Sequence, residues 1–205
     1  MIKQGIQNVI FDFGGVLVDL DRQRCIRTFK ELGIKGIDRY LDVSHHLGFF
    51  MQFEKGEITA PVFRDEIRSL SGSSLTDTQI DNAWNSLLGL IPSYKLENLL
   101  SLRKRYKTYL LSNTNSIHWK WSCERLFRYK DNNMQDYFEK IYLSYELGCA
   151  KPAPSVFEAV ITDSGIKPEE TFFIDDSQAN CETAQSIGFS VYQPANGEDW
   201  SFIFK

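Results

Sequence analysis

The chain has 205 residues, 42% hydrophobic and 24% charged, which is typical of one folded domain, alone or with an inserted subdomain, and excludes a disordered chain. Its formal net charge is −4, so overall charge gives no reason to expect a nucleic-acid or membrane-surface partner. No stretch approaches the roughly 18 apolar residues of a membrane span, and residues 1–9 do not resemble a signal peptide. The four cysteines form no CxxC pair, so we expect reduced thiols in a cytoplasmic protein.

Five short apolar runs predict buried strands. They occupy residues 8–13, 108–112, 140–144, 171–175 and 190–193. Helical patterns are expected over 94–106, 154–164 and 178–187, where a proline near the start of the second and Gly188 after the third mark helix ends. Strands that alternate with helices predict an α/β fold with a mostly parallel sheet.

The stretch from 21 to 90 departs from this alternation. It has apolar residues at helical spacing, such as Ile26, Phe29 and Leu32, and no convincing strand. It is too long for a single crossover between neighbouring strands. We therefore expect a core built from residues 1–20 and 91–205, with a helical cap, residues 21–90, inserted between the first and second strands.

Polar side chains that could take part in catalysis or ligand binding follow the predicted strands. The first run delivers Asp12, the second Ser112 and Asn113, the segment after the third Lys151, and the fourth Asp175 and Asp176. Because ligands of open α/β sheets bind beyond the carboxyl ends of the strands, these residues are expected to converge at one edge.

Together these residues fit phosphoryl transfer. Asp12 is a candidate nucleophile that would form an aspartyl-phosphate. Three carboxylates in one place favour Mg²⁺, which prefers oxygen ligands, and Lys151 would offset the charge of the phosphoryl group. Ser112 and the amide of Asn113 would bind a phosphate oxygen. Each residue alone is common as a cap, turn or solvated side chain, but their joint occurrence at strand ends favours the catalytic interpretation.

Four segments resemble the motifs of the haloacid dehalogenase (HAD) superfamily of phosphohydrolases, in the order found in that family. They are Phe11–Leu17, Leu111–Asn115, Lys151–Phe157 and Phe173–Asn180. The resemblance implies a Rossmann-like three-layer sandwich with a mostly parallel central sheet and a helical cap. The residues of these motifs, and Phe53–Ile58 in the expected cap, resemble those of bacterial sugar-phosphate phosphatases of the α-glucose-1-phosphate type.

The resemblance also implies roles by position. Asp12 would be the nucleophile and a metal ligand, joined at the Mg²⁺ by the main-chain oxygen of Gly14 and by Asp175 and Asp176. Ser112 and Lys151 would be catalytic and, with Asn113, would bind the substrate, a small phosphorylated metabolite. Asn180 would support the acidic pair. Nothing in the sequence fixes the oligomeric state.

One position departs from the family pattern. Typical phosphatases of the superfamily carry a second aspartate, a general acid and base, where this chain has Gly14. General acid catalysis contributes about 10²- to 10⁴-fold, so substrates with good leaving groups, such as sugar 1-phosphates, would suffer least. His45, His46 or Glu54 of the cap are candidate replacements, although they are also ordinary residues for a cap surface or core.

Two alternatives remain open at this point. A 2-haloacid dehalogenase also uses an aspartate nucleophile and needs neither the second aspartate nor a metal, but Asp175 and Asp176 would repel its anionic substrate. A non-catalytic phosphate sensor would explain Gly14. The aromatic segment 49–53 and the run 118–121 are compatible either with lining a substrate entrance or with helix packing.

Overall fold

The computed structural model describes residues 2–41, 47–195 and 197–205. The strands are β1 (Asn8–Phe11), β2 (Lys107–Ser112), β3 (Lys140–Leu143), β4 (Thr171–Ile174) and β5 (Ser190–Tyr192). The α-helices are α1 (Arg22–Glu31), α2 (Phe49–Glu54), α3 (Ala60–Ser71), α4 (Asp77–Asn85), α5 (Ser93–Leu102), α6 (Ser116–Arg125), α7 (Met134–Tyr137), α8 (Ser144–Leu147), α9 (Pro154–Ser164) and α10 (Gln178–Ile187). Short 3₁₀ helices are η1 (Ile37–Arg39), η2 (Pro168–Glu170) and η3 (Trp200–Phe204).

The five strands form one parallel sheet in the order β3-β2-β1-β4-β5. Strand β1 lies at the centre, where Phe11 pairs with Leu110 of β2 on one side and Ile174 of β4 on the other. This confirms the predicted α/β fold with a parallel sheet. Its central position explains why β1 is buried along its whole length.

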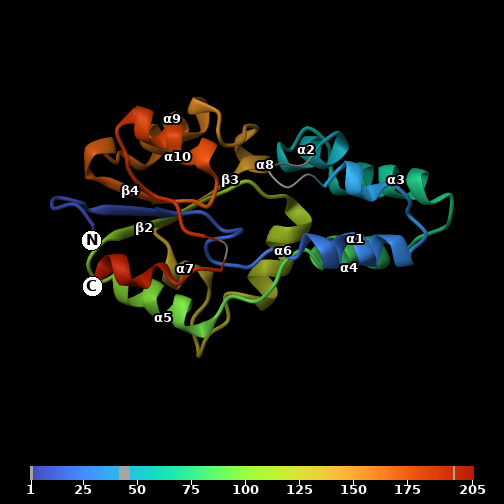
Figure 1. Ribbon diagram of the computed structural model, residues 1–205, viewed down its shortest axis with the longest axis horizontal. Coiled ribbons are helices and arrows are strands. Elements are labelled where there is room, and N and C mark those ends of the chain that lie inside the picture. Colours follow the sequence, from blue (N-terminus) through green and yellow to red (C-terminus); the bar gives the residue numbers. More distant parts are fainter. Residues whose placement is uncertain (1, 42–46, 196) are drawn as a thin grey trace.

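Alternate residues of the strands face two different hydrophobic layers, as the pleat of a strand requires. Val9 and Phe11 belong to the cluster shared with α5 and η3, whereas Ile10 belongs to the cluster shared with α9 and α10. Figure 1 shows α9 and α10 over one face of the sheet, with α5 and the C-terminal segment over the other. The result is the three-layer sandwich expected from the family resemblance.

Helices α1–α4 gather at one end of the molecule, beside the sheet (Figure 1). They pack around a separate hydrophobic cluster that includes Phe29, Phe50, Phe63 and Trp84. Two linkers, one after β1 and one after α4, lead to these helices and run side by side. They are joined by a bridge between Leu20 and Leu88, and by hydrogen bonds from Asp21 N to Leu87 O and from Gly89 N to Asp19 O, each 2.8 Å long.

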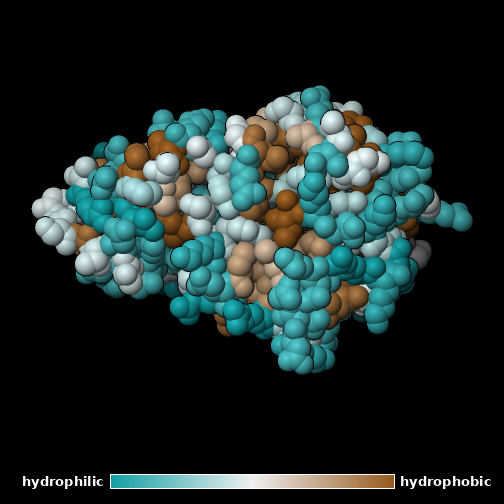
Figure 2. Space-filling view, turned by 180° about the vertical axis from the view of Figure 1, so that it is seen from behind, coloured by the Kyte–Doolittle hydropathy of each residue, from teal (hydrophilic) through white to brown (hydrophobic). Residues whose placement is uncertain are grey.

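Some boundaries differ from those predicted. Helices α9 and α10 have the predicted limits, but α5 ends at Leu102 instead of continuing to residue 106, because residues 103–106 turn toward β2. No limits were predicted for helix α6, which follows the turn after β2. No helix in the described residues is long and apolar enough to span a membrane. On the face in Figure 2, hydrophobic residues appear in small patches among polar ones.

Candidate active site

The carboxyl ends of β1 and β4 place the acidic residues side by side. Asp12 directly follows β1 and its amide donates to Ile174 O at 2.8 Å, which continues the pairing of the two strands by one residue. Asp175 and Asp176 directly follow β4. Oxygens of Asp12, Asp175 and Asp176 all lie within 4.8 Å of one another, so folding brings the three predicted carboxylates together.

Lys151 lies among these carboxylates although it comes from the loop after α8. Its ammonium nitrogen is 2.8 Å from Asp12 Oδ1, 2.6 Å from Asp175 Oδ2 and 2.8 Å from Leu111 O. The residue is only 4% exposed. Although burial opposes its charged form, Asp12 and Asp175 raise the pKa of Lys151 above its usual value. One fixed positive charge therefore faces three acidic groups.

The remaining negative charge perturbs Asp12 and Asp176. Burial, together with Asp175 and Asp176, raises the pKa of Asp12 to about 8 against the opposing effect of Lys151. Burial and Asp175 also raise the pKa of Asp176. Buried carboxylates with this much mutual repulsion require additional positive charge to ionise together. Carboxylate oxygens are hard ligands of the kind that a magnesium ion prefers.

Asp175 is held differently from its neighbour. The side-chain amide of Asn180 donates to both of its carboxylate oxygens, at 2.9 and 3.0 Å, and the amide of Ser177 donates to Oδ1 at 2.9 Å. With Lys151 also on Oδ2, both oxygens of Asp175 already accept hydrogen bonds. Asp175 therefore fixes Lys151 and the start of α10 whether or not it also contacts a metal ion.

Ser112 and Asn113 lie at the end of β2, on the same edge of the sheet. Ser112, the last residue of the strand, is buried. The side chain of Asn113 accepts from Lys151 N at 2.9 Å and donates to Lys151 O at 2.8 Å. This clamp on the lysine loop was not anticipated from the sequence. A phosphate contact by Asn113 would use its main-chain amide.

Gly15 has a steric role that the sequence analysis missed. Its φ is +74°, and a Cβ at this position would lie 2.1 Å from Asp176 Oδ2. Only glycine tolerates both the left-handed backbone and this close approach. The two consecutive glycines after the acidic strand end were the available signal, because such pairs mark tight turns. Gly14 lacks a positive φ and lies beside the flexible side chain of Leu20, where an added Cβ would be 3.0 Å from Leu20 Cδ1.

Comparison with known proteins agrees with this geometry. Residues 6–188 match the family described as haloacid dehalogenase-like hydrolase. The chain belongs to this family. It is 42% identical over 195 residues, 95% of each chain, to a D-ribitol-5-phosphate phosphatase of Bacteroides thetaiotaomicron.

Solved structures of HAD family members are also similar. A HAD family enzyme from Bacteroides thetaiotaomicron, an Asp12-to-alanine variant in complex with magnesium and inorganic phosphate, gives a TM-score of 0.96 at 54% identity, covering 98% of this chain and 99% of that one. A HAD-like hydrolase from Porphyromonas gingivalis gives 0.90 at 39% identity, covering 97% and 96%. An L-2-haloacid dehalogenase gives 0.61 at 14% identity over 93% and 85%, a likeness of fold alone.

In this HAD chain, the aromatic segment 49–53 serves packing. Phe49, Phe50 and Phe53 are buried, and Phe53 stacks on Phe63 with ring centroids 4.6 Å apart. Glu54 is half-buried. Its main-chain oxygen lies 2.5 Å from Ser144 Oγ, a contact between α2 and α8. His45 and His46, the other candidate replacements for the missing acid, lie outside the described residues.

The run 118–121 is also mostly packed. His118 is 3% exposed, stacks on Trp84 with centroids 4.2 Å apart, and its Nε2 lies 3.1 Å from Trp84 O. Trp119 is buried against Phe13. Helix α6 therefore ties the sheet layer of this HAD fold to α4.

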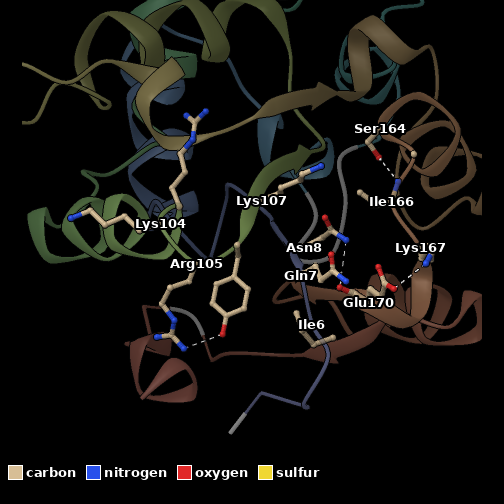
Figure 3. Close-up of a pocket in the computed structure, with 13 residues that line it drawn as sticks. Ile6, Gln7, Asn8, Lys104, Arg105, Lys107, Ser164, Ile166, Lys167 and Glu170 are labelled. Carbon is tan, nitrogen blue, oxygen red and sulfur yellow. Dashed lines mark hydrogen bonds and ion pairs between the residues drawn. The ribbon is translucent and has the colours of Figure 1, made fainter.

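A cavity of about 460 Å³ lies at the opposite edge of the sheet (Figure 3). Its wall includes Asn8 and Lys107, the first residues of β1 and β2, and Glu170 just before β4. Figure 3 shows Lys167 turned toward Glu170, 3.1 Å away. Because the acidic cluster follows the other ends of the same strands, this cavity is separate from that cluster.

Proposed function

We propose that this HAD chain is a magnesium-dependent phosphatase that acts on small phosphorylated sugars or sugar alcohols through an aspartyl-phosphate on Asp12. The observation that carries the proposal is the contact of Lys151 Nζ with both Asp12 and Asp175, 2.8 and 2.6 Å away, inside a cluster of three carboxylates. The phosphatase relative and the neighbour solved with magnesium and phosphate support the same chemistry.

The chemistry has two steps. A carboxylate oxygen of Asp12 attacks phosphorus, the bond to the leaving oxygen breaks, and that oxygen takes a proton. Water then attacks phosphorus, which releases inorganic phosphate and restores the carboxylate. Lys151 stays within reach of Asp12 and balances negative charge on the phosphoryl group in both steps. Ser112 and the amide of Asn113 hold a phosphate oxygen.

The acidic cluster would hold the magnesium ion. Asp12, Asp176 and the main-chain oxygen of Gly14 are the proposed ligands, with Asp175 as a further ligand or as the anchor of Lys151. When bound, the ion offsets the charge of the carboxylates and of the phosphate. A dehalogenase would have no use for this additional acidic pair, and a sensor would not need a buried nucleophile paired to a lysine.

The cap and the substrate belong to the same proposal. We assign residues 21–90 to a cap subdomain and residues 1–20 and 91–205 to the catalytic core, because, among the described residues, only Ile117 joins the hydrophobic cluster of α1–α4 from outside residues 21–90. The 42% identical relative takes its name from a sugar-alcohol phosphate, which supports a small polyol phosphate as substrate. The sparse, unpaired cysteines support a cytoplasmic location.

The test is turnover of a panel of sugar, sugar-alcohol and aryl phosphates with magnesium and then with chelator. We expect Asp12→Asn to lower kcat by on the order of 10³-fold or more, since the near-isosteric amide cannot attack phosphorus. Asp163→Asn is the matched control, because Asp163 pairs with Lys140 on the surface. Full activity of Asp12→Asn, or activity that survives chelation, would exclude the mechanism. Halide release from a 2-haloacid without phosphatase activity would favour dehalogenation.

A further inference from the structure

Two buried side chains from different elements donate to the same main-chain oxygen, that of Val16. Lys95 Nζ of α5 lies 2.7 Å from it, and Trp200 Nε1 of η3 lies 3.1 Å from it. Lys95 is 1% exposed and Trp200 is fully buried. Residues 95 and 200 are far apart along the chain, so this convergence exists only in the folded protein.

Burying a lysine at this position is energetically unfavourable. Burial lowers the pKa of Lys95, and the carboxylates of Asp19 and Asp199 only partly oppose that effect. Neighbouring positions on α5, such as Leu96 and Leu99, are buried and apolar. An apolar side chain at position 95 would avoid the desolvation of an ammonium group. Packing alone therefore does not account for the lysine.

The oxygen that Lys95 and Trp200 hold belongs to the loop after Asp12. Inside this loop, Gly15 N donates to Val18 O at 2.8 Å, and Leu17 N donates to Phe13 O at 2.9 Å. Gly15 presses against Asp176 too closely for any side chain. The loop then continues into the first linker to α1. Its position consequently sets the distance between the residue 14–15 backbone and the acidic cluster.

We propose that Lys95 and Trp200 are positioning residues that fix the loop of residues 13–18 and thereby set the affinity of the site for its divalent cation. The inference rests on the proposed function, because it takes the main-chain oxygen of Gly14 and the carboxylate of Asp176 as ligands. Lys95 and Trp200 act through Val16 and touch neither the substrate nor the cation. Once the donors are removed, the loop samples positions in which the Gly14 oxygen is out of place, and cation binding must restore it.

The test uses Lys95→Met, an unbranched side chain one atom shorter and without the charge, and Trp200→Phe, which removes the indole donor and part of the ring. Mg²⁺ binding is measured by calorimetry on the whole protein, and the Mg²⁺ dependence of turnover is measured separately. We expect the Mg²⁺ dissociation constant to rise about tenfold or more in Lys95→Met, the size expected for loss of a charge-assisted hydrogen bond. The rise should be smaller in Trp200→Phe. In each variant, kcat at saturating Mg²⁺ should change by a smaller factor than the Mg²⁺ dissociation constant.

Thr108→Val is the control for general destabilisation. Thr108 is fully buried and donates to Tyr137 O at 2.7 Å, remote from the loop of residues 13–18. It should lower the unfolding temperature without changing Mg²⁺ affinity. Unchanged affinity in both Lys95→Met and Trp200→Phe, or an equal loss in Thr108→Val, would overturn the inference. If Lys95→Met does not fold, Trp200→Phe decides. Failure of the unsubstituted protein to bind Mg²⁺ would instead overturn the proposed function.

Discussion

At the scale of single residues, Gly14 is the position where this chain departs from typical HAD phosphatases. The atoms nearest to a Cβ added there belong to the side chain of Leu20, which is 38% exposed. The neighbouring Gly15 is different, because Asp176 leaves no space for a Cβ. Backbone geometry and the contact with Asp176 therefore require glycine at position 15, whereas the backbone conformation at position 14 does not.

We expect Gly14→Asp to raise the rate for substrates with poor leaving groups, because the new carboxyl can protonate the departing oxygen. General acid catalysis sets an upper limit of about 10²- to 10⁴-fold on the gain. The measurement is kcat/KM for an alkyl phosphate relative to p-nitrophenyl phosphate. Gly14→Asn has nearly the same size without an acidic proton, so equal gains from Asn and Asp would contradict the explanation. No gain from Asp would indicate that another group already supplies the proton.

At the scale of elements, a helix could be predicted from the sequence when only one of its faces is buried. Helices α9 and α10 have clear ends, with Pro154 at the start of one and Gly188 after the other, and their limits were predicted. Helix α6 has a good N-cap, Asn115, yet its extent was not predicted. Ile117 faces the cluster of α1–α4 while Trp119 faces the cluster under the sheet. Burial on two sides erases the single apolar stripe by which a helix is recognised.

The contact between α2 and α8 was equally hidden, because it depends on one hydroxyl and one main-chain oxygen. Ser144 is 2% exposed, accepts from Thr114 N at 2.9 Å, and lies 2.5 Å from Glu54 O. It thus joins the loop after β2 to the end of α2. No pattern of residue types signals such a contact before the fold is known.

We expect Ser144→Ala to raise KM for phosphate esters about threefold to tenfold, because α2 loses a bridge of about 1 kcal/mol and Thr114 N loses its acceptor. The changes in kcat and in Mg²⁺ affinity should be smaller. The comparison is Ser122→Ala, which removes a buried hydroxyl bonded within α6 to His118 O at 2.7 Å. Equal effects of the two substitutions on KM would show that the Ser144 bridge has no special part in substrate binding.

At the scale of the whole molecule, the parallel sheet is what turns scattered residues into a site. Asp12, Lys151 and Asp176 were predicted to meet because strands of one parallel sheet end at one edge, and they do lie together. The order of the strands in the sheet and the individual side-chain contacts could not be predicted from the sequence. The clamp of Asn113 on Lys151 and the Lys95 contact with Val16 depend on side-chain directions that only packing determines.

The same arrangement couples magnesium to protons and to stability. In metal-free protein, burial and the neighbouring Asp175 and Asp176 raise the pKa of Asp12 to about 8 against the effect of Lys151, so at pH 7 we expect the folded state to hold a proton that an ordinary aspartate in the unfolded chain has lost. A bound cation favours the ionised carboxylate and must displace that proton. Mg²⁺ affinity is therefore expected to increase as pH rises from about 6.5 through 8 and to level off above it.

Calorimetric titration of Mg²⁺ in two buffers of different ionisation enthalpy measures the protons released, which should decline toward zero above about pH 9. Because only the folded chain assembles the three carboxylates, Mg²⁺ at 100 times its dissociation constant should add about 2.7 kcal/mol to the free energy of unfolding. The unfolding temperature should rise accordingly, and Asp12→Asn should reduce the proton release. An Mg²⁺ affinity that stays constant between pH 6.5 and 9 would mean that Asp12 is already ionised in the metal-free protein, with Lys151 outweighing burial and both neighbouring carboxylates.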